Sequence, residues 1–423
     1  MLNRTQAPDF KQVSNIKFIH PEKSILDNGV PVFTVYSGEQ DLVRIEFLFD
    51  NVNWNAEKPL QAIAVNAMLN NGTTKLSSKE IAAQIDFYGA FFQTEYGQDH
   101  STVTLYTLNK HLASVLPIVK DVLSDSQFPQ KELDIYIQNQ KQKLQVNLQK
   151  NDILSRKEFS HALFGNTVYG VDIQLKHYDA VKRDDLLAYF SAAYTPNNCT
   201  IVVAGKFSEQ SFSLLNEHFG NNWKPSNSIK NEFNFDLSQK NEVYKEKTES
   251  LQSAIRIGRL AINRKHSDFA GLQILNCVLG GYFGSRLMNN IREDKGYTYG
   301  IGSGIVSMKN AGYFFIATEV GADVCSAALT EIYKEIELLK SELVEEEELD
   351  LVRNYMLGSM LGSLENVFSH ADKFKNIYFS GLDYSYYENY INKVKTITTV
   401  EIKDLANKYL TTETFTEVVV GKK

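Results

Sequence analysis

The 423-residue sequence has few of the residues that usually mark a disulfide framework or a metal centre. Its three cysteines, Cys199, Cys277 and Cys325, are far apart and follow no CxxC spacing. An odd number of widely separated cysteines predicts neither a disulfide framework nor a structural zinc site. We therefore expect three buried or half-buried thiols, as in proteins of a reducing compartment.

Familiar catalytic motifs are also lacking. No two of the eight histidines lie four residues apart, and no glutamate stands between two of them in a metal-site pattern. The sequence contains no GxSxG elbow and no phosphate loop with its Lys-Ser/Thr pair. The glycine-rich segment LGGYFGSRL (279–287) follows an expected helix rather than a strand, so it does not predict a dinucleotide site.

Charge and hydropathy argue against two further classes of partner. Lysine and arginine total 44 and aspartate and glutamate total 51, which gives a formal net charge of −7. Nucleic-acid-binding proteins usually present a basic face, so no nucleic acid is expected. No run of about 18 apolar residues occurs, so no membrane span is expected. The first ten residues, MLNRTQAPDF, lack an apolar secretory region, which predicts a cytoplasmic location.

Strand and helix patterns follow one another in the same order in both halves. The expected strands are a hairpin around the Asp-Asn-Gly turn at 27–29, then 43–49, 101–108, 253–260, 297–306 and 312–319. The expected helices are 60–69, 77–88, 112–124, an amphipathic helix from 130 onwards, 269–279, 285–292, 323–340 and 345–361.

This repetition predicts two homologous domains. A strand, a long helix, an acidic loop and a second long helix at 102–148 recur at 313–361, about half the chain later. The polar segment 221–242 is the expected junction, which gives domains at 1–225 and 226–423. Hairpins and short connections favour an α+β fold in which each domain is a mainly antiparallel sheet packed with helices.

One segment, NNIREDKGYTYGIGSGI (289–305), combines residues that suit carbonyl chemistry. Arg292 and Tyr299 flank a charged turn through Gly296, so both side chains are able to converge on one space. A guanidinium and a phenol are strong donors that can hold a carbonyl oxygen as it becomes an oxyanion. The same pattern also describes a charged helix end followed by an aromatic strand.

SRLMNNIREDKGYTYGIGSG resembles the second-domain signature of the pitrilysin/insulinase superfamily of zinc peptidases, which includes the mitochondrial processing peptidase and short two-domain bacterial peptidases. LDNGVPVFTV, IDFYGAFFQTEYGQDHSTVTLY and TPNNCTIVVAGKF are similar to three segments of its first domain. The resemblance spans nearly the whole chain from about Leu26 and implies a processing-peptidase-like duplication. It also implies that Arg292 and Tyr299 bind a substrate carbonyl.

The zinc motif of that superfamily is missing. Its inverted H-x-x-E-H motif precedes a Gly-Thr turn. When that turn is anchored on Gly72-Thr73 in QAIAVNAMLNNGTTK, the motif falls on Ile63, Asn66 and Ala67. Ile and Ala offer no metal ligand, and Asn is no general base. No glutamate lies between residues 132 and 158 to supply the third ligand, so no metal is expected in this chain.

The resemblance therefore implies a non-catalytic subunit of a heterodimeric zinc metalloendopeptidase, with no autonomous activity. A homologous partner with an intact H-x-x-E-H motif would hold the zinc, and this chain would supply Arg292 and Tyr299. Unfolded peptides would be the substrates, lying extended along a sheet edge. In this chain the segment 91–95, with Phe91, Gln93 and Glu95, is the candidate edge. A catalytically inert scaffold and a peptide-binding homodimer of the same fold are the alternatives.

Overall fold

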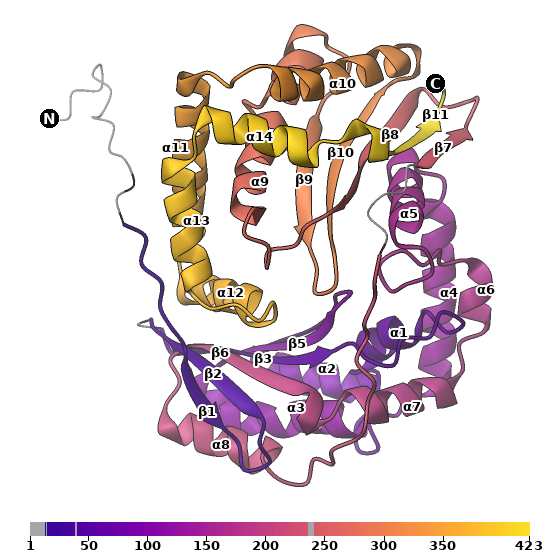
Figure 1. Cartoon of the computed structure of the whole chain (residues 1–423). Coiled ribbons are helices and arrows are strands. Elements are labelled where there is room, and N and C mark those ends of the chain that lie inside the picture. Colours follow the sequence, from indigo (N-terminus) through magenta and orange to yellow (C-terminus); the bar gives the residue numbers. More distant parts are fainter. Residues whose placement is uncertain (1–12, 14, 39, 236–240) are drawn as a thin grey trace, which may run out of the picture.

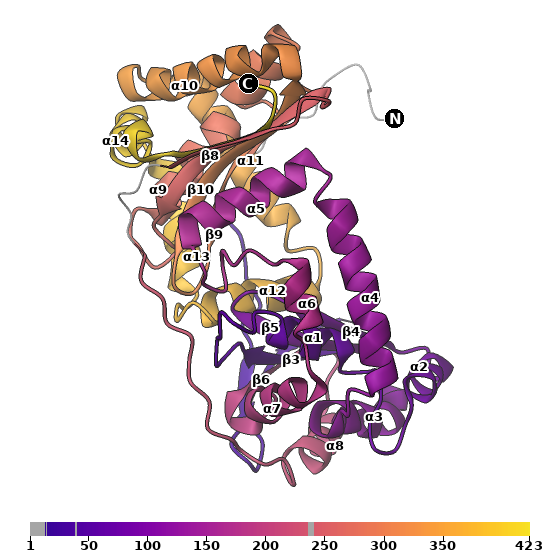
Figure 2. The ribbon, with the colours of Figure 1, turned by 90° about the vertical axis from the view of Figure 1, so that its right-hand side faces the viewer.

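The computed structural model describes residue 13 and residues 15–38, 40–235 and 241–423. These residues form two sheets, one in each half of the chain, which lie one above the other in Figure 1. Each sheet has a layer of helices from its own half on one face (Figures 1 and 2). The expected α+β architecture with two similar halves is confirmed.

The first sheet has the strand order β1-β2-β6-β3-β5-β4. Its strands are β1 (Glu22–Ile25), β2 (Pro31–Tyr36), β3 (Leu42–Asp50), β4 (Phe91–Tyr96), β5 (His100–Leu108) and β6 (Cys199–Gly205). The β2–β6 pair is parallel and the other pairs are antiparallel. In β5 the buried and half-buried side chains alternate, so one face of the strand is more deeply buried than the other.

The helices of this half are α1 (Gln61–Met68), α2 (Ser78–Phe87), α3 (Leu112–Asp125), α4 (Gln130–Asn147), α5 (Asn151–Phe164), α6 (Leu175–Asp179), α7 (Arg183–Ala193) and α8 (Glu209–Phe219). Ser77 and Glu80 form a capping box that starts α2, close to the start of the helix expected at 77–88. The long helix α4 differs from the expected amphipathic helix, because Leu133 is its only fully buried residue.

The second sheet has the order β7-β11-β8-β10-β9. It consists of β7 (Asn241–Glu246), β8 (Gln252–Ala261), β9 (Ile301–Ser307), β10 (Gly312–Gly321) and β11 (Thr416–Gly421). The helical segments are α9 (Phe269–Asn276), η3 (Cys277–Gly281), η4 (Met288–Asp294), α10 (Cys325–Ser341), α11 (Glu346–Gly362), α12 (Val367–Tyr378), α13 (Ser385–Thr396) and α14 (Thr399–Tyr409). Again only one pair, β7–β11, is parallel.

The two halves exchange one helix. Helix α5 of the first half packs on β8 and β11, and helix α12 of the second half packs on β6 and β2. Phe374 of α12 joins a buried cluster with Phe33 and Leu48 of the first sheet. Phe159 of α5 joins Val418 and its neighbours on the second sheet. Each sheet therefore has one face on its own helices and the other on a helix of the opposite half (Figures 1 and 2).

Two expectations about the segment that contains Arg292 are wrong in detail. The strand expected at 297–306 begins only at Ile301, so Tyr299 lies in the preceding loop. The helix expected at 285–292 is mainly a π-helix, η4, that runs to Asp294. Among the described residues, no helix is long and apolar enough to cross a membrane.

Candidate active site

Arg292 lies within the π-helical segment η4, and a second π-helical segment, η3, precedes it. η3 ends at Gly281, and η4 begins at Met288. π-helical turns are rare and often occur at functional sites, because the wider turn redirects side chains. Met288 and Ile291 are buried in the core of the second half and anchor η4, while Arg292 is half-buried.

Polar contacts fix η4 to the helices behind it. The Asn290 amide donates to Glu331 at 2.9 Å and to the buried Glu335 at 2.7 Å, both on α10. Arg286, just before η4, forms a two-point ion pair with Glu348 at the start of α11, at 2.8 and 2.7 Å. A bidentate ion pair is strong and also fixes the relative orientation of its two side chains. The backbone that leads into Arg292 is therefore held at two points, residues 286 and 290.

Arg292 is oriented by two neighbours. Its guanidinium lies over the ring of Phe283, 4.5 Å from the ring centroid. Its Nη1 lies 2.9 Å from a carboxylate oxygen of Glu293. A cation over an aromatic face is attracted by the ring quadrupole, which restrains the side chain without using its hydrogen-bond donors. Sequence reasoning missed Phe283, which lies in the glycine-rich segment 279–287.

Tyr299 is 95% exposed, and its hydroxyl has no hydrogen-bond partner among the described residues. Its loop is nevertheless fixed. The hydroxyl of Thr298 donates to the Glu319 carbonyl at 2.6 Å, which ties the loop to β10. Gly296 makes the preceding turn with φ +66°, a conformation that side chains disfavour. A free phenol thus stands on a restrained loop.

Within the described chain, no hydrogen bond or ring contact joins Arg292 to Tyr299. The two side chains are separate donors on opposite sides of the Gly296 turn. Arg292 is paired with Glu293 through Nη1, and the Tyr299 hydroxyl has no partner in the described chain. Together they can donate to one carbonyl oxygen that enters between them. Their convergence on a substrate stays a prediction.

The positions of the missing zinc motif lie on α1. Asn66 is 1% exposed, and its amide donates to the Tyr194 hydroxyl at 3.2 Å. Burial raises the pKa of that hydroxyl to about 12, so it stays protonated. Ile63 faces a cavity of about 190 Å³, and Ala67 is exposed. Ile63 and Ala67 have no atom that can bind a metal, and the Asn66 amide is hydrogen-bonded to Tyr194. These residues therefore do not fit zinc.

No cluster of three or more His, Cys, Asp or Glu side chains able to hold a metal occurs in the described ranges. Strand β4, which contains the candidate substrate contacts Phe91, Gln93 and Glu95, is the last strand of its sheet. These three side chains are exposed and alternate along the strand, so they share one face. Strand β9, which follows Tyr299, is the last strand of the other sheet. The candidate edge strand and the Arg–Tyr segment thus occupy equivalent places in the two halves.

Comparison with known families agrees with this duplication. Residues 62–172 match "Insulinase (Peptidase family M16)", and residues 180–356 match "Peptidase M16 inactive domain". The chain is 26% identical over 314 residues to "Uncharacterized zinc protease YmxG" of Bacillus subtilis, covering 72% of this chain and 75% of that protein. It is 24% identical over 365 residues to "Non-peptidase homolog YmxG" of Helicobacter pylori, covering 84% and 83%.

Solved structures share the fold. A peptidase M16 inactive domain from Pseudomonas fluorescens superposes with a TM-score of 0.84 at 22% identity, covering 95% of this chain and 98% of that one. A chain of the complex III2 structure from Candida albicans superposes with a TM-score of 0.74 at 13% identity, covering 95% of each. With α1 unable to bind zinc and both halves matched, the chain belongs to the insulinase (M16) peptidase family as a non-catalytic member.

Proposed function

We propose that this chain is the non-catalytic subunit of a heterodimeric zinc endopeptidase. The observation that carries the proposal is the contrast between the two halves. The first half has lost every side chain that would bind zinc or activate water, whereas the second half keeps Arg292 and Tyr299 available on a restrained backbone. A purely structural remnant has no need of a phenol that is 95% exposed.

In this proposal Arg292 and Tyr299 have different roles. The Arg292 guanidinium donates to the carbonyl oxygen of the scissile peptide bond and fixes its position. The Tyr299 hydroxyl donates to the same oxygen as negative charge develops on it. Donors that are already in place at a developing oxyanion stabilise the transition state more than the ground state. Zinc and the general base would come from a homologous partner with an intact H-x-x-E-H motif.

The substrates would be unfolded peptides. An extended peptide can add to an exposed sheet edge, where main-chain hydrogen bonds give affinity and alternate side chains give specificity. The β4 edge, with Phe91, Gln93 and Glu95 on one face, suits this mode. A cytoplasmic location remains part of the proposal, because a processing complex of this kind would act on peptides inside the cell.

The first test is a native pull-down of the full chain with mass spectrometry. A near-stoichiometric partner of similar size with an intact zinc motif is the expected result. The reconstituted pair then serves for Arg292→Ala and Tyr299→Phe, each of which should lower kcat by about a hundredfold. Tyr36→Phe is a matched control, because Tyr36 is also exposed but lies on the first sheet. Unchanged turnover in both variants would remove the catalytic assistance.

An inert scaffold is the second candidate. The Helicobacter pylori relative is named a non-peptidase homolog, and the complex III2 chain has the same fold. Recovery of this chain only within a large assembly without a zinc-bearing homologue would favour the scaffold. Recovery only with itself, together with peptide binding, would favour a peptide-binding homodimer.

A further inference from the structure

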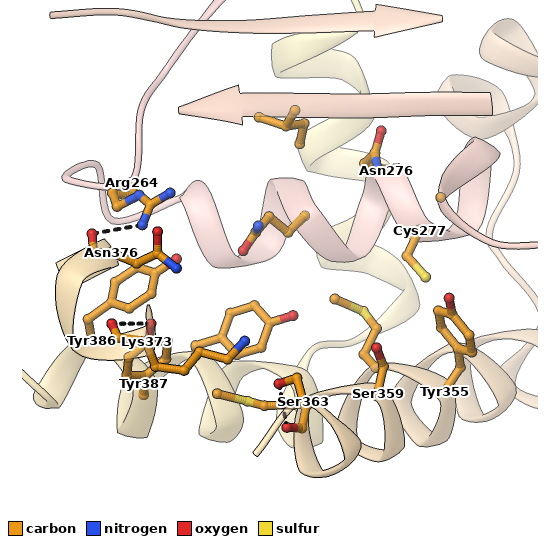
Figure 3. Close-up of a pocket in the computed structure, with 16 residues that line it drawn as sticks. Arg264, Asn276, Cys277, Tyr355, Ser359, Ser363, Lys373, Asn376, Tyr386 and Tyr387 are labelled. Atoms are coloured by element: carbon orange, nitrogen blue, oxygen red, sulfur yellow. Dashed lines mark hydrogen bonds between the residues drawn. The ribbon is translucent and has the colours of Figure 1, made fainter. Parts of the chain in front are cut away.

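A cavity of about 420 Å³ opens among the helices of the second half. Side chains from α9, α11, α12 and α13 line it, and Ile305 of β9 closes one side. Figure 3 shows α9 on one side of the opening and α11 on the other. A volume of a few hundred Å³ is typical of small-molecule sites.

The charge of this cavity has one sign. Among the described residues that line it, the only charged side chains are Arg264 and Lys373, and no carboxylate is present. Burial raises the pKa of the Cys277 thiol to about 12, so this side chain carries no negative charge either. The phenol of Tyr386 is also kept protonated, because burial raises its pKa. The lining therefore combines two cations with neutral polar groups.

The two cations differ in what holds them. Arg264 is fixed by the chain: its Nη1 donates to the Asn376 carbonyl at 2.8 Å and its Nε to Ser307 Oγ at 3.2 Å. The ammonium of Lys373 has no hydrogen-bond or ion-pair partner in the described structure. Its side chain extends into the opening, as Figure 3 shows. The adjacent Asp372 is already engaged by Arg44 and Lys375.

Lys373 is in an environment that disfavours its charge. Burial lowers its pKa, the charge of Arg264 lowers it further, and Asp372 opposes both effects. A half-buried ammonium without a partner is costly unless an anion accompanies it. Lys373 thus places at this opening a half-buried cation that has no hydrogen-bonded or ion-paired carboxylate in the described structure, an arrangement that favours an anionic ligand.

Apolar side chains adjoin the cations. Met356 and Met360 of α11 line the cavity beside Ile305. Methionine side chains adapt to differently shaped apolar groups. A second cavity, of about 590 Å³, is also lined by Arg264, Tyr386 and Tyr390. Asp383 lines this second cavity as well, so its lining carries charges of both signs. The first cavity is the better match for an anion with an apolar part.

We propose that the cavity among α9, α11, α12 and α13 binds an organic carboxylate, such as the C-terminal residue of a peptide. The carboxylate accepts hydrogen bonds from Lys373 and from the free guanidinium hydrogens of Arg264, and its apolar group lies along Met356 and Met360. Charge-assisted hydrogen bonds of this kind are about twice as strong as neutral ones. The site goes beyond the proposed peptidase role and requires neither Arg292, Tyr299 nor a partner.

The test is calorimetric titration of the full chain with N-acetyl-Leu-Phe, compared with the same dipeptide amidated at its C-terminus and with inorganic phosphate. The free acid should bind with a Kd of about 1 mM or tighter. The amide, which lacks the charge, should bind at least about tenfold more weakly. Phosphate, which lacks the apolar part, should also bind more weakly than the acid.

Variants locate the site. Lys373→Met should reduce the affinity for the acid about tenfold, and Lys373→Arg, which keeps the charge, should restore most of it. Lys79→Met is the matched control, because Lys79 is an exposed lysine on α2 of the first half. Four results would overturn the proposal: no binding of the acid, equal binding of acid and amide, equal binding of phosphate, or an unchanged affinity in Lys373→Met.

Discussion

Arg44 on β3 and Asp372 on α12 join the two halves of the chain, with Nη2 of the arginine 2.8 Å from Oδ1 of the aspartate. Arg44 is only 5% exposed and also lies 3.1 Å from Glu46. Burial alone would lower the pKa of Arg44, but the carboxylates of Glu46 and Asp372 raise it above its ordinary value. Lys375 of α12 completes the cluster by donating to Glu46 at 2.6 Å. The exchanged helix α12 is therefore fixed by charge as well as by apolar packing.

Arg44→Met is expected to lower the free energy of unfolding by about 3 kcal/mol or more, because it leaves the buried Glu46 carboxylate with one cation fewer. Urea denaturation monitored by circular dichroism measures the change. Lys75→Met is the control, since Lys75 pairs with Asp121 at the surface and such pairs contribute less than about 1 kcal/mol. Equal losses in the two variants would contradict a special role for the buried cluster.

A second contact between the halves is expected to make stability depend on pH. Asp50 lies 3.0 Å from His100 and 2.8 Å from Lys309 of the β9–β10 turn. Burial would raise the pKa of Asp50, but these two partners lower it to about 2. A carboxyl with a depressed pKa stabilises the fold above its unfolded-state pKa, and that contribution is lost as the pH falls toward the folded-state value.

The unfolding midpoint in urea should therefore decrease between about pH 4 and pH 2. Asp50→Asn should be less stable than the wild type at neutral pH and should lose less stability over that acidic interval. The measurement is a series of urea titrations at stepped pH for both proteins. If the unfolding midpoints of the wild type and Asp50→Asn decrease in parallel as the pH falls, Asp50 is not the source of the acid sensitivity.

The sequence predicted the repeated elements well, because their patterns are local. The hairpin around residues 27–29 and the long helices all follow from short-range rules. The place of β4 at a sheet edge was also predicted. The family resemblance rests on short segments such as 289–305, whose residues lie close together in the chain.

The sequence did not predict the features that depend on distant contacts. Helices α5 and α12 carry apolar residues such as Phe159 and Phe374. The local sequence pattern does not indicate that each helix packs on the sheet of the other half. The segment η4 is π-helical, and its Asn290 contacts α10 more than 40 residues further along the chain. The cationic cavity joins Arg264 and Lys373, which are more than a hundred residues apart.

Phe283→Ala tests whether the orientation of Arg292 matters for the proposed activity. The exposed ring supports the guanidinium from one face and takes no part in donating to a substrate. Its loss should lower kcat of the reconstituted heterodimer about fivefold, less than Arg292→Ala, because only the restraint is removed. Phe87→Ala, which removes another exposed ring on α2, is the control. A decrease in kcat as large as that caused by Arg292→Ala would instead indicate that Phe283 itself contacts the substrate.

The thiols provide a test of the fold that does not depend on any proposed activity. Cys199, Cys277 and Cys325 are all buried. Burial raises the pKa of each thiol, and the thiolate is the reactive form. Ellman's reagent at about pH 8 should therefore react slowly with the native chain, and all three thiols should react in urea. Cys277 lines the cavity that we assign to a carboxylate, so it should react first among the three, and Cys277→Ser should remove that phase. A fast native reaction that persists in Cys277→Ser would mean that Cys199 or Cys325 is accessible, contrary to the packing of both cores.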